Sequence, residues 1–177
     1  MTKRTNTLKV GDKVVHRHHG GGIICAIAEQ TVNGHPAQYF VIENIIDGMK
    51  HYIPIQHAAE AQLSPVEVGI TPEESLQNML HEDLAVPADH NQLNEIVNEK
   101  IEEGSIQSLA IAVGMIYEYR KQESLKKRPI SQLTRKVLQH AEKLLSSHIA
   151  LIENINYQNA ENQLHVWLDQ AYPQYAA

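Results

Sequence analysis

The spacing of apolar residues changes from every second residue to every third or fourth near residues 67–70. Before this point, short runs rich in Val, Ile and aromatic residues alternate with turn-forming pairs such as Asn33-Gly34 and Asp47-Gly48. After it, each apolar run has the period of one helix face and follows a capping residue. This change predicts an α+β protein with two domains. The first, residues 1–66, is a small antiparallel β-barrel, and the second, residues 70–177, is an all-α helical domain.

The N-terminal segment predicts four strands, over residues 12–17, 22–30, 38–45 and 49–55. Alternation along the second strand separates two sets of side chains. One face is expected to carry Ile23, Cys25 and Ile27, and the other Ile24, Ala26 and Ala28. One helical turn is expected within the sequence QHAAEA before a last extended stretch, LSPV.

The C-terminal segment predicts five helices. Thr71-Pro72-Glu73-Glu74 is a capping box for a helix that runs to about His81. Asp89, Ser105 and Ser131 are predicted N-caps of three more helices, and Gly104 is the predicted end of the first of these. The third helix should bury a single apolar stripe from Ile106 to Tyr117. A last helix stops before Pro173 and carries Trp167 on its apolar stripe, where a core position is expected.

The sequence HRHHGGG, residues 16–22, has three interpretations. A zinc site is one, since His16 and His18 would share a face, but no Cys or acidic cluster nearby supplies further ligands. A phosphate-binding loop is another, but its glycines should open a helix, and these lead into a strand. The third, a sharp turn between two strands made by the glycines, is the prediction, with no metal bound.

Composition narrows the function classes. The chain has 177 residues, a net charge of −6 and one cysteine, which excludes an internal disulfide and a multi-cysteine zinc site. No apolar run approaches the roughly 20 residues of a membrane helix, and the polar start MTKRTNT is no signal segment. A cytoplasmic protein without membrane contact is therefore expected. No nucleophile, base and orienting residue form a catalytic set, so a binding protein without a cofactor is predicted rather than an enzyme.

Charge is unevenly distributed along the chain. Residues 66–117 carry one Lys or Arg and ten Asp or Glu, whereas residues 118–143 carry eight and three. The basic residues of the sequence RKQESLKKRPISQLTRK flank a predicted turn between two helices. They are Arg120, Lys121, Lys126, Lys127, Arg128, Arg135 and Lys136. Clustered at a turn, they could reach one phosphate backbone, and a merely solvated loop is the other interpretation. No spacing typical of base reading is present, so backbone contact is expected.

The sequence LKVGDKVVHRHHGGGIICAI resembles the opening of the CarD-like (CdnL) family of bacterial transcription regulators, typically KxGDxVVYPxHGxG. His16 and Arg17 replace the usual Tyr-Pro. QYFVIENIIDGMKHYIPIQHAAEAQLSPV is similar to the rest of that family's N-terminal module, which also occurs in transcription-repair coupling factors. The helical segments EEGSIQSLAIAVGMIY and ISQLTRKVLQHAEKLLSSHIAL resemble the family's C-terminal half. The resemblance spans about residues 8–172.

This resemblance implies a fold and a function. The barrel would be Tudor/SH3-like and would bind the RNA polymerase β subunit. The helical domain would contact promoter DNA without reading its sequence and would stabilise the open complex. The family's two basic polymerase contacts fall on Gln30 and Tyr52 here, with Lys50 and His51 beside the second. A monomer is expected.

One departure from the family concerns DNA. Members commonly place a Trp, followed by arginines, at the start of the first long helix of the DNA-binding half. Counting back from Gly104 puts His90 at that position, followed by Asn91 and Gln92. A His offers less apolar surface to hold an unstacked base step open. The alternative function is therefore a protein-only adaptor, which binds polymerase or another protein while its acidic helices repel DNA.

Overall fold

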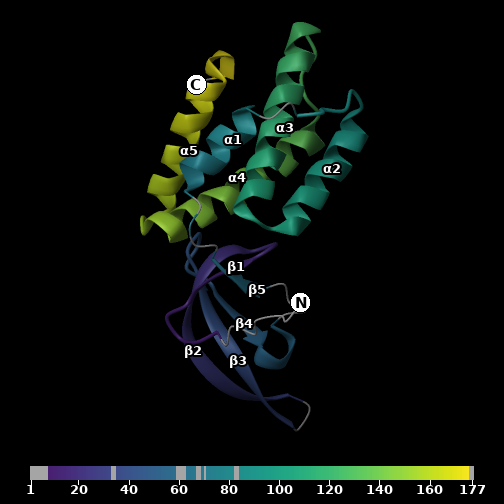
Figure 1. The fold of residues 1–177 in the computed structure, drawn as a ribbon. Coiled ribbons are helices and arrows are strands. Elements are labelled where there is room, and N and C mark those ends of the chain that lie inside the picture. Colours follow the sequence, from purple (N-terminus) through teal and green to yellow (C-terminus); the bar gives the residue numbers. More distant parts are fainter. Residues whose placement is uncertain are drawn as a thin grey trace. The chain divides into compact units, whose positions relative to one another are not determined.

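The computed structural model describes residues 8–32, 35–58, 63–66, 69, 71–81 and 84–175 (Figure 1). The chain divides into two compact units, Met1–Val66 and Glu67–Ala177. In the described residues, the first unit is a five-stranded antiparallel sheet and the second contains five α-helices. The predicted α+β class, with a Tudor-like β domain followed by a helical domain, is thereby confirmed.

The sheet has the strand order β4-β3-β2-β1-β5. Its strands are β1 (Lys13–His16), β2 (Gly20–Val32), β3 (His35–Asn44), β4 (Lys50–Pro54) and β5 (Leu63–Pro65). A short 3-10 helix, η1 (Ile55–His57), follows β4 and overlaps the start of the expected helical turn. Every pairing is antiparallel, as expected for strands joined by short connections.

One side of the sheet carries the core of this unit. Its buried side chains come from all strands except β4, and they are Val14, Ile24, Phe40, Ile42 and Leu63. Leu8, Ile53, Ile55 and Ala58 pack against them at its border. Because side chains alternate along each strand, Val15 and Val41 lie on the opposite face, where they are also buried.

A β-bulge in β2 changes which side chains share a face. The register shifts between Ile24 and Ala26, so Cys25 is the extra residue. Beyond it, Ile27 pairs with Phe40 on the core side of the sheet. The predicted grouping of Ile23 with Ile27 is therefore wrong, since an inserted residue moves all later side chains to the opposite face.

Two of the predicted turns lie between described strands. Gly48 has a φ of 71°, and the Met49 amide donates to Asp47 Oδ1 over 3.0 Å, which makes the predicted Asp-Gly turn between β3 and β4. Val32 pairs with His35, so a two-residue connection joins β2 to β3. The predicted Asn33-Gly34 turn itself lies outside the described residues.

The helices begin close to the predicted caps. They are α1 (Pro72–His81), α2 (His90–Glu103), α3 (Ile106–Leu125), α4 (Gln132–Glu153) and α5 (Tyr157–Ala171), followed by the 3-10 turn η2 (Pro173–Tyr175). The capping box of α1 forms both reciprocal bonds between Thr71 and Glu74. Asp89, Ser105 and Ser131 cap their helices, and Asn156 caps α5.

The environment of two helices differs from the prediction. α3 contacts α1, α2 and α4, and its buried residues surround much of its circumference, so a single apolar stripe does not describe it. Small residues such as Ala110, Ala112 and Gly114 permit this close packing. Trp167 on α5 is only partly buried, whereas Leu164 and Leu168 are in the core. The expected core position of Trp167 is therefore wrong.

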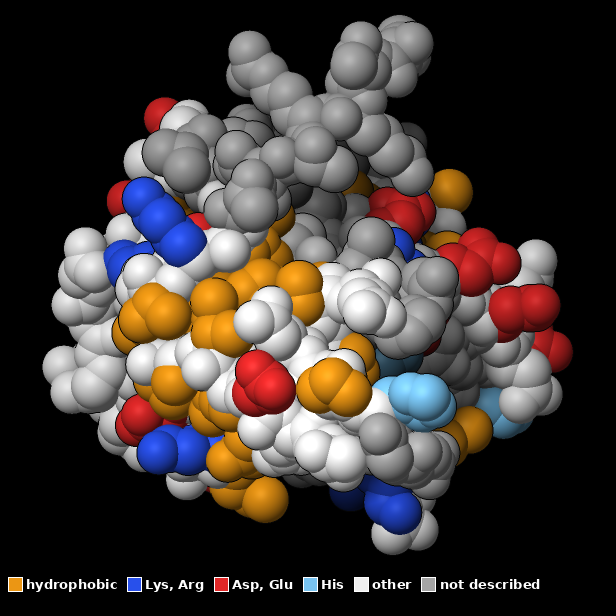
Figure 2. Space-filling view, turned by 90° about the horizontal axis from the view of Figure 1, so that it is seen from below, with side chains coloured by type: hydrophobic (Ala, Val, Ile, Leu, Met, Phe, Trp, Pro, Cys, Tyr) orange, Lys and Arg blue, Asp and Glu red, His pale blue; other side chains and the backbone are white. Residues whose placement is uncertain are grey.

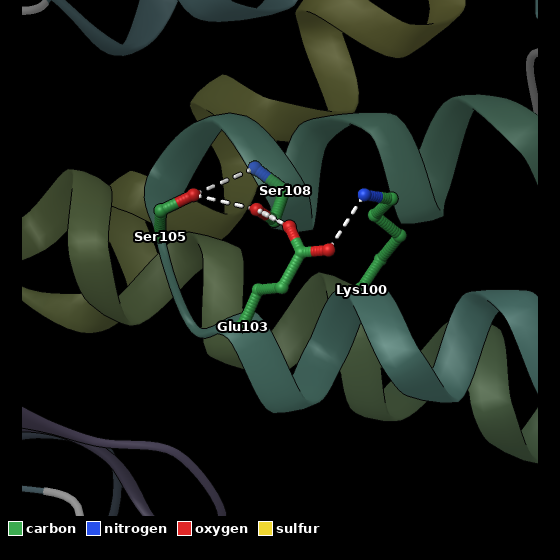
Figure 3. A network of polar contacts seen from close by, with 4 residues as sticks. All are labelled: Lys100, Glu103, Ser105 and Ser108. Carbon is green, nitrogen blue, oxygen red and sulfur yellow. Dashed lines mark hydrogen bonds and ion pairs between the residues drawn. The ribbon is translucent and has the colours of Figure 1, made fainter.

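A polar network fixes the corner between α2 and α3 (Figure 3). The Glu103 carboxylate accepts from Lys100 Nζ and from Ser108 Oγ, each over 2.6 Å. Ser105 Oγ accepts from the Ser108 amide over 3.0 Å. These hydrogen bonds link the end of α2 to the first turn of α3, and they therefore fix the angle between the two helices. None of the described helices is long and apolar enough to cross a membrane.

Candidate functional site

The histidine-rich stretch forms the turn between β1 and β2. Gly20 begins β2 with a φ of 80°, as predicted for a glycine turn. His16 Nδ1 accepts from the backbone amides of His18 and His19, over 3.2 and 3.3 Å. The His19 ring lies against His16 and also stacks on His51 of β4, with ring centroids 4.6 Å apart. This turn is therefore held by its own imidazoles.

Two of these imidazoles, His16 and His19, favour the neutral form. Burial, and secondly the charge that His19 would carry, lower the pKa of His16 to about 4. Burial is also the main cause that lowers the pKa of His19. Both rings and His51 line a cavity of only about 10 Å³, which is room for about one water molecule. Among the described residues, no three His, Cys, Asp or Glu side chains are grouped so that they could hold a metal ion.

The edge strand β4 presents three of the four proposed polymerase contacts. Lys50 and Tyr52 lie on the outer face of the sheet, opposite Glu43 and Val41, and Tyr52 is 48% exposed. His51 points to the other face, where it stacks on His19. Gln30 pairs with Ala37 near the end of β2. The bulge puts Gln30 on the same face as Tyr52, so the outer face unites Gln30, Lys50 and Tyr52 and leaves out His51.

Exposed apolar residues accompany this face. On the face drawn in Figure 2, hydrophobic side chains lie close together, with charged side chains among and around them and histidines beside them. Among the described residues of the N-terminal unit, the large hydrophobic residues exposed by more than a third are Val10, Ile23, Ile27, Met49 and Tyr52. Ile23 and Tyr52 belong to the outer face of the sheet. Apolar surface of this kind suits contact with another protein.

The basic segment of the helical unit divides between two surfaces. Arg120, Lys127, Arg128 and Arg135 line one groove of about 920 Å³ between α3, α4 and α5. Lys121 and Lys126 instead pair with acidic residues one helical turn earlier, Glu118 and Glu123. Lys136 is exposed on α4 and does not line the groove.

His90 is the first residue of α2, as the count from Gly104 predicts. Its side chain is 49% exposed, with Nδ1 3.9 Å from Asp89 Oδ1. Burial raises the pKa of the Tyr119 hydroxyl on α3, which also senses the charges of Glu123, Lys126 and Asp89. Asp89, which precedes α2, and Glu123 and Lys126, which lie at the end of α3, thus all act on this hydroxyl.

The sequence matches a known family at the N-terminal unit. Residues 8–67 match the model of the CarD-like/TRCF RID domain, which covers the strands described above. The N-terminal domain belongs to the CarD-like family. The chain is also similar to a Bacillus subtilis (strain 168) protein named "Putative transcription factor YdeB". The two are 27% identical over 147 residues, which are 83% of this chain and 93% of the relative. The similarity to this relative therefore extends over most of the chain.

Several residues of the helical groove were missed by the sequence analysis. Tyr117, Glu142, His165, Asp169 and Tyr175 line it together with the arginines. They come from α3, α4, α5 and η2, which are distant in sequence. The Arg120 guanidinium lies 4.0 Å above the centre of the Tyr175 ring. The cluster of basic residues in the sequence predicted one wall of the groove. No local pattern predicted Tyr175 or the acidic residues Glu142 and Asp169 of the other wall.

Proposed function

We propose that this CarD-like protein is a transcription regulator that binds the β subunit of RNA polymerase through its N-terminal domain. The match of residues 8–67 to the CarD-like/TRCF RID domain carries this proposal. The helical domain contacts the sugar-phosphate backbone of promoter DNA and stabilises the open complex. The similarity to a protein named as a transcription factor supports the same role. The protein acts by binding, as a monomer in the cytoplasm, and not as an enzyme.

The polymerase contact uses the edge and outer face of the sheet. β4 lies at the end of the strand order, so its outer edge offers backbone groups to a strand of the partner. Lys50 and Tyr52 flank this edge on one face, with Gln30 further along it. His51 supports the strand from the other face, through its stack on His19.

The DNA contact uses the basic segment and the start of α2. The groove between α3, α4 and α5 is lined by Arg120, Lys127, Arg128 and Arg135. Outside it, His90 begins α2 and Lys126 follows the last residue of α3. Lys121 on α3 and Lys136 on α4 are exposed, and both add positive charge to this region. Positive charge of this kind binds phosphates without reading bases, so sequence-tolerant and salt-sensitive binding is expected.

Co-purification with RNA polymerase tests the polymerase contact. Tyr52→Glu adds a negative charge to the outer face and should weaken retention on polymerase by roughly tenfold or more. Gln38→Glu is the matched control, since it adds the same charge at an exposed position on the opposite face of the same sheet. Equal retention of both variants would contradict the proposed contact face.

The second candidate function is a protein-only adaptor. The negative charge of residues 66–117, with ten acidic and one basic residue, favours it because such a surface repels DNA. Titration of a promoter duplex with the purified protein at several salt concentrations separates the two functions. Undetectable DNA binding at low salt, with polymerase binding intact, would favour the adaptor.

A further inference from the structure

The groove of the helical domain has a charge pattern beyond what DNA contact requires. It lies between α3, α4, α5 and η2, and its volume of about 920 Å³ is within the range of small-molecule sites. Arg120, Lys127, Arg128 and Arg135 supply positive charge from α3, the following turn and α4. Glu142 and Asp169 supply negative charge from α4 and α5.

Three other basic residues of the helices are neutralised by a neighbouring glutamate. Lys100, Lys121 and Lys126 each pair with a glutamate three residues away, over 2.6, 3.4 and 2.7 Å. Within the described residues, none of the four groove cations is within ion-pairing distance of a carboxylate, including Glu142 and Asp169 of the same groove. Positive charge that is gathered but not neutralised favours an anionic ligand.

Two of these cations are positioned by the fold. Arg120 is held over the Tyr175 ring at 4.0 Å, which fixes its guanidinium at the groove wall. Lys127 has a φ of 57°, a left-handed conformation that favours glycine at the end of a helix. A lysine at this position costs backbone stability and brings a charge to the groove. The strain is consistent with a functional side chain at this position.

The acidic wall is suited to hydrogen-bond donors. Tyr117 donates to Glu142 Oε1 over 3.2 Å, and burial raises the pKa of the Glu142 carboxyl. Asp169 and His165 lie along the same wall. Carboxylates accept from hydroxyl and amino groups, whereas they repel phosphates. The floor between the two walls includes the apolar residues Ile130 and Leu138.

We propose that this groove is a binding site for a phosphorylated small molecule that also carries hydroxyl or amino donors, of the nucleotide class. Arg120, Lys127, Arg128 and Arg135 would hold its phosphate groups, and Asp169 with Glu142 would accept from its donors. A duplex backbone is a continuous row of phosphates, and the acidic wall opposes such a row. The site therefore shares its four cations with the proposed DNA contact, but its binding of a small ligand does not require that DNA binds.

Calorimetric titration of the full chain tests the phosphate half of the site. The probes are inorganic tripolyphosphate and two metal-free nucleoside triphosphates, ATP and GTP. Arg135→Gln and Lys127→Gly should each weaken binding of all three by roughly tenfold, because each removes a charge-assisted contact. Lys127→Gly relieves the left-handed strain, so it is a variant that keeps its fold. Lys136→Gln removes a neighbouring cation outside the groove and should change affinity less than about twofold.

Asp169→Asn tests the donor half of the site. It should weaken a nucleoside triphosphate more than tripolyphosphate, which has no donor groups to lose. An equal change for both probes would overturn the assignment of the acidic wall. A fluorescence-polarisation titration of a labelled DNA duplex, with the same variants, distinguishes the two sources of phosphate.

The outcomes separate this site from the proposed function. Binding of the triphosphates that depends on Arg135 and Lys127 but not on Lys136 supports the site, whether or not DNA binds. No binding of any probe at millimolar concentration would overturn it. Loss of DNA binding alone in Arg135→Gln and Lys127→Gly, with no triphosphate binding by the unchanged protein, would assign the groove to the DNA backbone instead.

Discussion

His148 on α4 is a buried titratable residue, with 4% of its surface exposed. Burial lowers its pKa to about 4, from 6.5 in the unfolded chain. Between these two values the unfolded state binds a proton that the folded state does not. The free energy of unfolding of the helical domain should therefore fall as the pH drops from 6.5 to 4, by up to about 3 kcal/mol.

Replacing His148 should remove this pH dependence. Trp167 is the chain's one tryptophan and lies on α5, so its fluorescence follows unfolding of the helical domain alone. We expect urea unfolding of His148→Gln to depend less on pH between 6.5 and 4 than unfolding of the original protein. Burial raises the pKa of Glu142, which acts in the opposite direction and is unchanged in both proteins. Parallel pH profiles would show that His148 does not titrate as stated.

His90 is the residue at which DNA contact is most directly tested. It begins α2 with a half-exposed side chain. His90→Trp adds apolar surface that can hold an unstacked base step, and the lifetime of the open promoter complex should lengthen. His90→Ala should shorten it only slightly. If neither substitution changes the lifetime while polymerase binding persists, His90 does not contact DNA.

The element that determines the shape of the N-terminal domain is the hairpin of β2 and β3. Gly22 allows the two strands to approach, because a Cβ there would lie 2.5 Å from Ile42 Cγ2 and 2.9 Å from the Glu43 carbonyl oxygen. Gly22→Ala should destabilise this domain by roughly 1–3 kcal/mol, as overpacking does. Gly48→Ala meets no neighbouring atom but has a φ of 71°, and should cost about 1 kcal/mol.

Hydrogen exchange of the sheet amides measures these losses in the N-terminal domain, where no tryptophan is present. The larger loss of stability is expected for Gly22→Ala, because the new Cβ would meet the backbone carbonyl of Glu43, which cannot rotate away as a side chain can. A larger loss at Gly48 than at Gly22 would mean that β2 and β3 can separate with little cost.

At the corner between α2 and α3, one serine supports both helices. Ser105 Oγ accepts from the Ser108 amide, and Ser108 Oγ in turn bonds Glu103 at the end of α2. Ser105→Ala should lower the unfolding free energy of the helical domain by about 1 kcal/mol, the usual cost of a lost N-cap. Trp167 fluorescence in urea measures this, with the exposed Ser124→Ala as the control. Equal stabilities of these two variants would show that the cap contributes little.

At the scale of the whole molecule, DNA binding depends on charge distribution and not on net charge. The protein carries −6 overall, yet its basic residues gather at the ends of α3 and α4. Reversing Lys126, Lys127 and Arg128 together to Glu should reduce the slope of log affinity against log salt by up to about three units. Lys100→Glu, at the far end of α2, is the control. An unchanged slope in the triple variant would identify the basic segment as a solvated surface.

Local sequence signals were sufficient to predict the order of the two domains and most of the element boundaries. Caps such as Asp89, Ser105 and Ser131 act within a few residues, so each can be read locally. The same holds for the glycine turn after His16 and the turn at Gly48. The resemblance of residues 8–67 to the CarD-like module likewise required only the order of residues.

The tertiary structure alone decided which residues meet. The bulge at Cys25 depends on how β2 pairs with β3, and it moved Ile27 to the core side. The stack of His51 on His19 joins β4 to the turn between β1 and β2, which is distant in sequence. The groove exists because α5 and η2 bring Asp169 and Tyr175 to Arg120. Contacts between distant segments depend on packing of the whole domain, which no local pattern of residues records.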